Sequence, residues 1–406
     1  MDNTCIGILV FLVAMVTSMA VFPWALMFAR RHGIVDNPNA RKLQRVPVPV
    51  FGGIVVYSGV LMGGLVLSLF LWSWVVVYGL IGMTIMMMIG MWDDMKDISA
   101  TLRFLIEIVL VSAFITLTGV YIDDFHGLWG INELNPWFAI PFSIVAGVGL
   151  INAVNLIDGV DGYSSGYGMM ACACFGVCYW KVWSPTMVCM NLVMIGALLP
   201  FFMHNVFGAK TRMFIGDGGT LMLGMWMTVC AFYSLSSTQK CDTLADQGLS
   251  LTAFTLAVLC IPVFDTVRVM TMRILRGRSP FSPDKTHLHH LFIDMGFSHL
   301  GAALFIIFIN FLVVLIWLAL WKLGASIDVQ TYVVAILGFL VTFGFYKFMK
   351  AQQNGGPEDE EGYPLGTKLW HMMYKVGNWT HREKKRSWRI MRLFVDGPLM
   401  GSLKAQ

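Results

Sequence analysis

The feature that most constrains this chain is a stretch from Val46 to Trp92 that contains no Asp, Glu, Lys or Arg. A helix needs about 20 apolar residues to cross the hydrocarbon core of a bilayer. The stretch has room for two such spans, and we expect the turn between them near Trp72-Ser73-Trp74. In the whole chain 57% of the residues are hydrophobic and 13% are charged. A typical soluble domain has about twice that charged fraction, so an ordinary soluble fold is excluded.

Apolar segments of this kind recur along the chain and predict an all-α integral membrane protein with eleven transmembrane helices. The fifth segment is the weakest, because Pro141 and Gly147 interrupt it and its end runs into a polar motif. The expected spans lie at 5–27, 49–71, 75–92, 103–121, 137–153, 163–182, 186–204, 218–236, 250–268, 300–321 and 329–348.

Positive charge divides unevenly between the two sides that eleven spans define. Apart from Lys181, Lys240 and Lys322, the lysines and arginines all fall on the side reached after the odd-numbered spans. Positively charged loops mark the cytoplasmic side of a membrane protein. We therefore expect the N-terminus outside and the C-terminus in the cytoplasm. Residues 1–350 would form a polytopic transmembrane catalytic domain with cytoplasmic active-site loops, and 351–406 a cytoplasmic polar tail.

The tail contains a basic, tryptophan-bearing stretch at 381–392. Such a stretch either lies on anionic lipid or forms a short, solvated surface helix. If the chain is an enzyme, we expect deletion of the residues after 351 to leave its activity largely intact.

Adjacent carboxylates, Asp93 and Asp94, follow the third expected span. Neighbouring carboxylates raise each other's pKa unless a cation offsets them. At a membrane edge such a pair suits Mg²⁺ binding or proton abstraction. A solvated helix terminus is the competing interpretation.

A second polar motif follows the fifth expected span. Asn152, Asn155 and Asp158 recur at helical spacing and share one face, and Asp161 comes shortly after them. Polar groups at membrane depth are costly and usually functional. An Asx-rich turn without a binding role is the alternative.

The third motif places Asp217 in a glycine-rich turn, after Asn205 and directly before the eighth expected span. A helix N-terminus there would offer N–H groups to an anion, and the carboxylate would suit a metal beside phosphate. A plain helix cap by Asp217 is the alternative.

The fourth motif is a basic loop that ends in three histidines. It holds several arginines, among them Arg276, and then His287, His289 and His290. Arginines bind phosphates through paired hydrogen bonds. A zinc site and simple positive-inside anchoring are the alternatives, although no cysteine or fourth ligand has suitable spacing for zinc.

A fifth, weaker motif is the basic loop 36–42, in which Lys42 could hold a phosphate near the lipid surface. Taken together, carboxylates suited to a metal and cations suited to phosphate share one predicted face. That combination favours phosphoryl transfer at the membrane interface. A transporter or lipid flippase is the second hypothesis, and such a protein would place charges within its spans. In this chain most expected spans are free of charge, with Glu107 and Asp265 as the main exceptions. A membrane scaffold that uses the basic tail is the third.

These motifs, in this order, resemble those of the bacterial polyprenyl-phosphate N-acetylhexosamine-1-phosphate transferase family over about residues 30–300. The histidine loop is similar to that of undecaprenyl-phosphate GlcNAc-1-phosphate transferases and unlike that of phospho-MurNAc-pentapeptide translocases. Two positions depart from the family: Gln44 stands where His is common, and Thr220 where Ser is common.

The resemblance implies a Mg²⁺-dependent enzyme, with Mn²⁺ as an alternative ion, in the bacterial cytoplasmic (inner) membrane. It would transfer a sugar-1-phosphate, GlcNAc-1-phosphate first among the candidates, from a UDP-N-acetylhexosamine to undecaprenyl phosphate and release UMP. This would be the first membrane step of a cell-surface glycan such as O-antigen. Membrane lipids would be further partners, a homodimer is left open, and nucleic acid is not expected.

The resemblance also implies roles for individual residues. Asp217 and Asn155 would ligate Mg²⁺, and Asp93 and Asp94 would handle the lipid phosphate and its proton. Lys42 would approach the lipid phosphate. Contacts to the nucleotide sugar would come from Asn152, Asp158, Asp161 (at the uracil), Asn205, Arg276, His287, His289 and His290.

Overall fold

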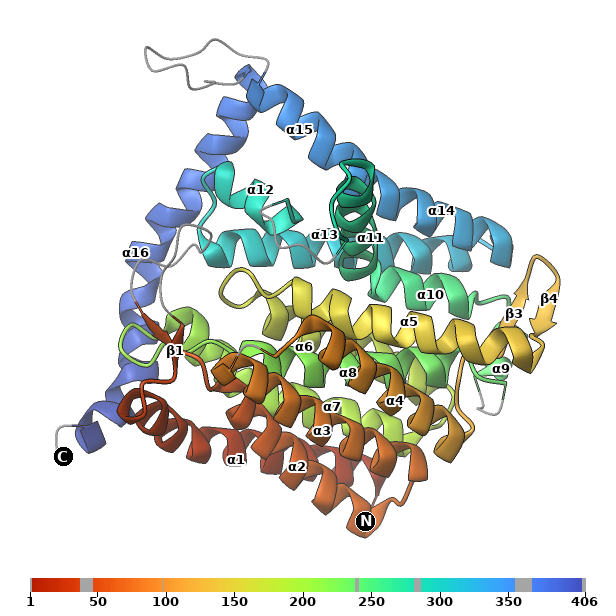
Figure 1. The fold of residues 1–406 in the computed structure, drawn as a ribbon, viewed down its shortest axis with the longest axis horizontal. Helices are drawn as coiled ribbons and strands as arrows, with labels where there is room; N and C mark the ends of the chain where they lie inside the picture. The colour runs from red at the N-terminus through yellow and green to blue at the C-terminus, as the bar shows by residue number, and fades with distance from the viewer. Residues whose placement is uncertain are drawn as a thin grey trace.

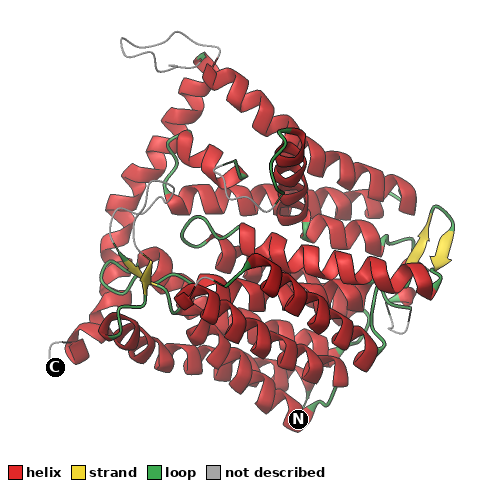
Figure 2. Cartoon of the chain, viewed as in Figure 1, coloured by secondary structure: helices red, strands yellow, loops and turns green. Residues whose placement is uncertain are grey.

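The computed structural model describes residues 2–36, 47–96, 98–237, 241–280, 286–354 and 367–403. In these residues the chain is built almost wholly of helices packed side by side, with two small antiparallel sheets at opposite ends of the bundle (Figures 1 and 2). The sheets pair β1 (Val35–Asp36) with β2 (Val48–Pro49) and β3 (Asp124–Leu128) with β4 (Ile131–Glu133). The helices are α1 (Asn3–Arg31), α2 (Gly52–Phe70), α3 (Trp74–Lys96), α4 (Ala100–Thr118), α5 (Pro136–Leu156), α6 (Tyr163–Lys181), α7 (Pro185–Phe207), α8 (Gly216–Ser234), α9 (Asp242–Ala245), α10 (Leu251–Val258), α11 (Cys260–Leu275), α12 (Leu288–Asp294), α13 (His299–Lys322), α14 (Ile327–Phe339), the π-helical η1 (Leu340–Gly344), α15 (Phe345–Asn354) and α16 (Lys368–Leu403).

Eight helices in the described residues are long and apolar enough to cross a membrane: α1 to α5, α7, α13 and the continuous helix Ile327–Asn354. The bent pair of α10 and α11 would make a ninth. The chain is therefore an all-α, multi-pass membrane protein. The expected turn between the second and third spans is confirmed, because α2 ends at Phe70 and α3 begins at Trp74. The interrupted fifth span is one continuous helix that runs to Leu156.

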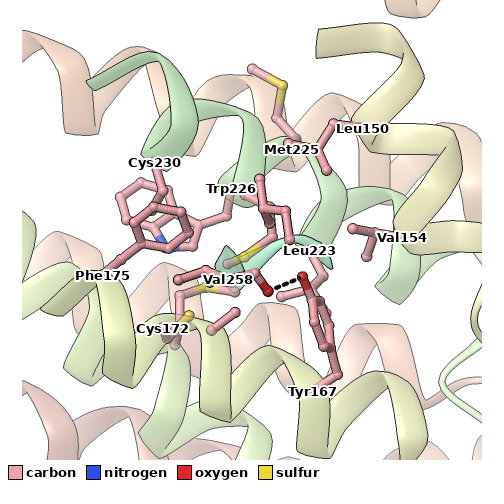
Figure 3. Packing of buried hydrophobic residues seen from close by; sticks show 14 of the residues in the cluster. Leu150, Val154, Tyr167, Cys172, Phe175, Leu223, Met225, Trp226, Cys230 and Val258 are labelled. Atoms are coloured by element: carbon pink, nitrogen blue, oxygen red, sulfur yellow. Dashed lines mark hydrogen bonds between the residues drawn. The ribbon is translucent and has the colours of Figure 1, made fainter. Parts of the chain in front are cut away.

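Helices α6 and α8 do not reach the same apolar standard. One face of α6 is exposed, at Ala173, Val177 and Trp180, whereas α8 packs inside the bundle. Every residue of α8 except Asp217 is buried. A helix that protein surrounds on all sides needs no lipid-facing stripe, so it tolerates small and polar residues. The core where α5, α6 and α8 meet (Figure 3) includes Leu150, Val154, Tyr167, Cys172, Phe175, Leu223, Met225, Trp226 and Cys230.

The ninth expected span is broken rather than straight, and α10 and α11 meet at a bend of 74°. Pro262 explains the break, because it has no N–H and its ring meets the carbonyl of Val258 four residues earlier. Backbone groups freed in a membrane must find partners within the protein. Asn310 supplies them: its amide donates to the Val258 carbonyl over 3.0 Å and accepts from the N–H of Ile261 over 2.9 Å. The hydroxyl of Tyr167 donates to the same carbonyl over 3.2 Å (Figure 3).

Glycines allow three helices to approach closely at one end of the bundle. A side chain at Gly90 of α3 would collide with the backbone of α8 at Asp217 and Gly218. On the other flank, Gly53 of α2 lies against Gly219 of α8 in the same way. Small residues at helix interfaces bring backbones together in membranes. The close contact places the polar end of α3 directly beside the first turn of α8.

The tail forms a longer helix than expected. α16 has 36 residues and crosses the end of the bundle on the side where β1 and α12 lie (Figure 1). It is not a short, solvated surface helix, because Trp370 and Val395 are both buried.

Candidate active site

A cavity of about 780 Å³ lies at the end of the bundle that α16 crosses. Its volume falls within the range of about 300–1,000 Å³ that is common for small-molecule sites. Side chains from α3, the α5–α6 loop, α7, α8 and α12 line it. Among the predicted site residues it brings together Asp94, Asn155, Asp158, Asp161, Asn205, Asp217, His287, His289 and His290.

Asp94 caps the first turn of α8. Its two carboxylate oxygens accept hydrogen bonds from the backbone N–H groups of Asp217 and Gly218, over 3.1 and 3.3 Å. Gly216 has φ of +72°, and a side chain there would collide with the Asp94 carboxylate, so the turn requires glycine. Because Asp94 caps this helix, the Asp217 carboxylate is not used as the cap. The structure therefore disfavours the reading of Asp217 as a plain N-cap.

The carboxylate of Asp217 is held by Asn155 of α5. The Asn155 amide donates to Oδ1 of Asp217 over 3.1 Å and to the hydroxyl of Thr220 over 3.0 Å. The hydroxyl of Thr220 therefore accepts a hydrogen bond that a serine hydroxyl at this position could also accept. The two predicted metal ligands lie side by side at the mouth of the cavity.

Arg103 of α4 is a central member of the site that the sequence did not single out. Its Nη1 lies 2.8 Å from Oδ2 of Asp93 and 3.4 Å from Oδ2 of Asp217. Its Nε lies 3.7 Å from the buried Glu107. Asp93 also accepts from the N–H of Ile98 over 2.9 Å. Of the adjacent carboxylates, Asp93 thus turns toward Arg103, and Asp94 faces the cavity.

Asn152 lies away from the cavity, against α4. Its amide donates to the Glu107 carboxylate and, over 2.9 Å, to the carbonyl of Val148. It was predicted to contact the nucleotide sugar. The structure instead places it behind Arg103, where it orients Glu107.

Asp161 occupies another part of the cavity and has two basic partners. Nη2 of Arg212 lies 2.6 Å from its Oδ2, and Nδ1 of His299 lies 3.2 Å from the same oxygen. Burial alone would raise the pKa of Asp161, but the hydrogen bond and charge of His299, together with Arg212, hold it below its usual range. Arg212 and His299 were not predicted, because both lie far from Asp161 in the sequence.

Two of the predicted polar residues support the loop between α5 and α6. Asp158 accepts a hydrogen bond from the hydroxyl of Ser164 over 2.7 Å. The amide of Asn205 accepts from the N–H of Gly162 over 2.7 Å and donates to the carbonyl of Met213 over 2.9 Å. Asn205 therefore ties this loop to the segment before α8 and also lines the cavity.

The histidine loop is anchored to α11. Nδ1 of His287 lies 2.9 Å from Oδ2 of Asp265, whose other oxygen pairs with Arg268 over 2.7 Å. His289 is buried, and burial, followed by the neighbouring imidazoles, lowers its pKa well below the usual value. Arg276 is exposed at the end of α11, whereas the buried Arg273 lines the cavity. Of these two arginines, the structure thus favours Arg273 as the cation of the cavity.

Gly159 sets the position of His289, because a methyl group at Gly159 would overlap the imidazole ring. We expect Gly159→Ala to displace His289 from the cavity wall and to reduce turnover about tenfold or more. Steady-state transfer rates of the variant and the wild type would measure this. Gly149→Ala is a matched control, since that position has open space around it. Equal rates for Gly159→Ala and wild type would contradict a role for His289.

Lys42 and Gln44 lie outside the described residues. The contact of Lys42 with lipid phosphate therefore stays a prediction.

The fold and the cavity define a multi-pass membrane protein with acidic and basic side chains gathered at one end of its bundle. Residues 76–235 match glycosyl transferase family 4. The chain is 30% identical over 361 residues to a probable undecaprenyl-phosphate N-acetylglucosaminyl 1-phosphate transferase of Bacillus subtilis, an alignment that covers 86% of this chain and 97% of the relative.

Two enterobacterial relatives are similar in the same way. Undecaprenyl-phosphate alpha-N-acetylglucosaminyl 1-phosphate transferase of Escherichia coli O157:H7 is 30% identical over 289 residues, covering 70% of this chain and 75% of its own. The Yersinia pestis protein of that name is 28% identical, covering 69% and 75%. The chain belongs to the polyprenyl-phosphate N-acetylhexosamine-1-phosphate transferase family, as its motifs predicted.

Proposed function

We propose that this chain transfers GlcNAc-1-phosphate from UDP-GlcNAc to undecaprenyl phosphate and releases UMP. Its relatives carry the name of that activity. The observation that carries the proposal is the meeting of Asp94, Asn155 and Asp217 at one wall of a cavity whose other walls hold His287 and Arg273. Carboxylates for a metal and basic groups for phosphate are what phosphoryl transfer needs in one place.

We propose eleven membrane crossings, with the N-terminus outside and the C-terminus in the cytoplasm. The eight apolar helices, the bent pair of α10 and α11, and helices α6 and α8 together account for eleven. α8 has 19 residues, which is about 28 Å of helix and close to the thickness of the hydrocarbon core. The cavity would then open to the cytoplasmic face of the inner membrane, and α16 would be cytoplasmic.

The carboxylate end of the cavity fits a divalent cation. Asp94 and Asp217 line that end and Asp93 lies beside them, and in the described residues Arg103 pairs with Asp93 and Asp217. Proteins commonly hold Mg²⁺ through one or two carboxylates together with substrate phosphates. In the described parts of the chain no group of three or more His, Cys, Asp or Glu is placed to hold a metal by itself. We assign Asp217 and Asn155 as its ligands. When bound, Mg²⁺ neutralises the diphosphate charge.

The proposed reaction is a direct displacement. An oxygen of the lipid phosphate attacks the β-phosphorus of UDP-GlcNAc, the bond from that phosphorus to the bridging oxygen breaks, and UMP leaves. Asp94, which faces the cavity, orients the lipid phosphate and takes its remaining proton. His287 and Arg273 bind the diphosphate, and Asp161 binds the uracil. A phosphate oxygen is already a competent nucleophile near neutral pH, so positioning contributes more than proton removal.

Isotope exchange separates this mechanism from a covalent one. We expect labelled UMP not to exchange into UDP-GlcNAc when undecaprenyl phosphate is absent. Exchange in the absence of lipid would show a sugar-phosphate bound covalently to the enzyme.

Removal of divalent metal is expected to abolish turnover. EDTA treatment of the purified protein should reduce transfer to background, Mg²⁺ should restore it, and Mn²⁺ should restore part of it. Transfer at an undiminished rate in excess EDTA would refute the metal assignment.

A panel of UDP-sugars tests the substrate. The purified chain in detergent should release UMP from UDP-GlcNAc in the presence of undecaprenyl phosphate, and it should do so faster than from UDP-GalNAc or other UDP-N-acetylhexosamines. A transporter would release no UMP in detergent, where there are no two sides to transport between.

A further inference from the structure

The C-terminal helix α16 is attached to the rest of the chain at two places. The first is the turn between α12 and α13. The N–H of Ser298 donates to the hydroxyl of Thr380 on α16 over 2.9 Å. Gly377 of α16 is buried against the same turn, and a side chain there would collide with the backbone of Met295 and Gly296. Ser298 directly precedes His299, which contacts Asp161.

The second attachment is the loop between α7 and α8. Asp396 of α16 accepts a hydrogen bond from the N–H of Ala209 over 3.1 Å and another from the hydroxyl of Thr211 over 2.8 Å. Thr211 is almost fully buried, at 1% exposure, so this carboxylate–hydroxyl contact is shielded from water. Thr211 directly precedes Arg212, which pairs with Asp161 over 2.6 Å.

The two attachments therefore hold the two segments that supply the basic partners of Asp161. Thr380 and Asp396 are about 24 Å apart along one helix. Thr380 binds the residue before His299, and Asp396 binds the residue before Arg212. Arg212 and His299 come from different parts of the bundle, the loop before α8 and the start of α13. α16 links these parts on the outside, across the end of the bundle (Figure 1).

We propose that α16 is a strap that positions Arg212 and His299 around Asp161, and that Asp396 and Gly377 are positioning residues for the nucleotide. This inference rests on the proposed function, in which Asp161 binds the uracil of the UDP-sugar. The strap acts on the nucleotide part of the cavity. The Asp94–Asp217 part receives its contacts from α3, α5 and α4 instead.

The test compares the full-length protein with Asp396→Ala, Thr211→Ala, the double variant and Gly377→Leu in detergent. We expect each to raise KM for UDP-GlcNAc about tenfold and to leave KM for undecaprenyl phosphate within about twofold. The double variant should lose less than the sum of the two single variants, because Asp396 and Thr211 share one hydrogen bond and each also has a further contact, Asp396 with the N–H of Ala209 and Thr211 with His204. Lys375→Ala, an exposed position of the same helix, should behave as wild type.

Unchanged KM for UDP-GlcNAc in Asp396→Ala and Gly377→Leu would overturn the strap, as would an equal loss for both substrates that tracks a lowered melting temperature. If Asp396→Ala does not fold, Asp396→Asn keeps an oxygen acceptor and allows the same comparison. If the wild-type chain binds UDP-GlcNAc but does not transfer its sugar phosphate, the proposed function is refuted but the strap is not. In that case calorimetric measurement of UDP-GlcNAc binding by the same variants still tests the strap. Truncation before Lys368 should reproduce the effect, in contrast to the expectation that the tail is dispensable.

Discussion

Asp217→Asn is expected to lower turnover about 100- to 1,000-fold while leaving the fold intact. The amide keeps the shape of the carboxylate and an oxygen that can accept from Asn155, so the helix start stays in place. It loses the negative charge, which is what a metal or a developing phosphate charge requires. Steady-state transfer rates, together with the melting temperature in detergent, measure the two parts of this prediction.

The control for Asp217→Asn is Asp246→Asn, which removes an exposed carboxylate from a loop outside the cavity. Its rate should equal that of the wild type. A rate for Asp217→Asn near that of the wild type would remove Asp217 from the metal site. A large fall in melting temperature that accompanies the loss of activity would mean that Asp217 has a structural role.

Arg103→Met is expected to lower both stability and turnover. Arg103 is the shared cation of Asp93, Asp217 and Glu107, and Glu107 is completely buried. Removing one partner of a buried ion pair costs about 3–5 kcal/mol, because the remaining charges stay unpaired. Since 20% of the Arg103 side chain is exposed, we expect a value near the lower end of that range. Thermal unfolding in detergent and transfer rates would report the two losses.

Two further variants sharpen the Arg103 prediction. Arg103→Lys keeps the charge but lacks the planar group that reaches three carboxylates, so it should be intermediate in both measurements. Lys322→Met removes a positive charge from an exposed helix end and should change neither. An Arg103→Met protein as stable and active as wild type would show that the carboxylates need no fixed cation.

The membrane class and most of the motifs that line the cavity could be predicted from the sequence because both depend on local patterns. Apolar runs reveal most of the spans, and a motif such as Asp93-Asp94 reveals itself by composition at a span boundary. α6 and α8 were also located as helices, although neither reaches the apolar standard of the other spans. The bend at Pro262 was missed, because the partner that makes it tolerable, Asn310, lies 48 residues further along the chain.

The charge pairs of the site could not be predicted, because they join residues distant in sequence. Arg103, Arg212 and His299 each looked like an ordinary basic residue of a cytoplasmic loop or a helix start. Only the packing of the folded chain gives them acidic partners. The same applies to α16, whose amphipathic sequence indicated a surface helix but not the loop that Asp396 binds.

UDP-GlcNAc labelled at the β-phosphate tests the proposed transfer most directly, with purified wild type and Asp217→Asn assayed side by side. We expect the wild type to move the label into undecaprenyl diphosphate-GlcNAc and to release one UMP for each label transferred, and we expect Asp217→Asn to do neither at a comparable rate. Label that stays in the aqueous phase with the wild type, or transfer at equal rates by both proteins, would contradict it.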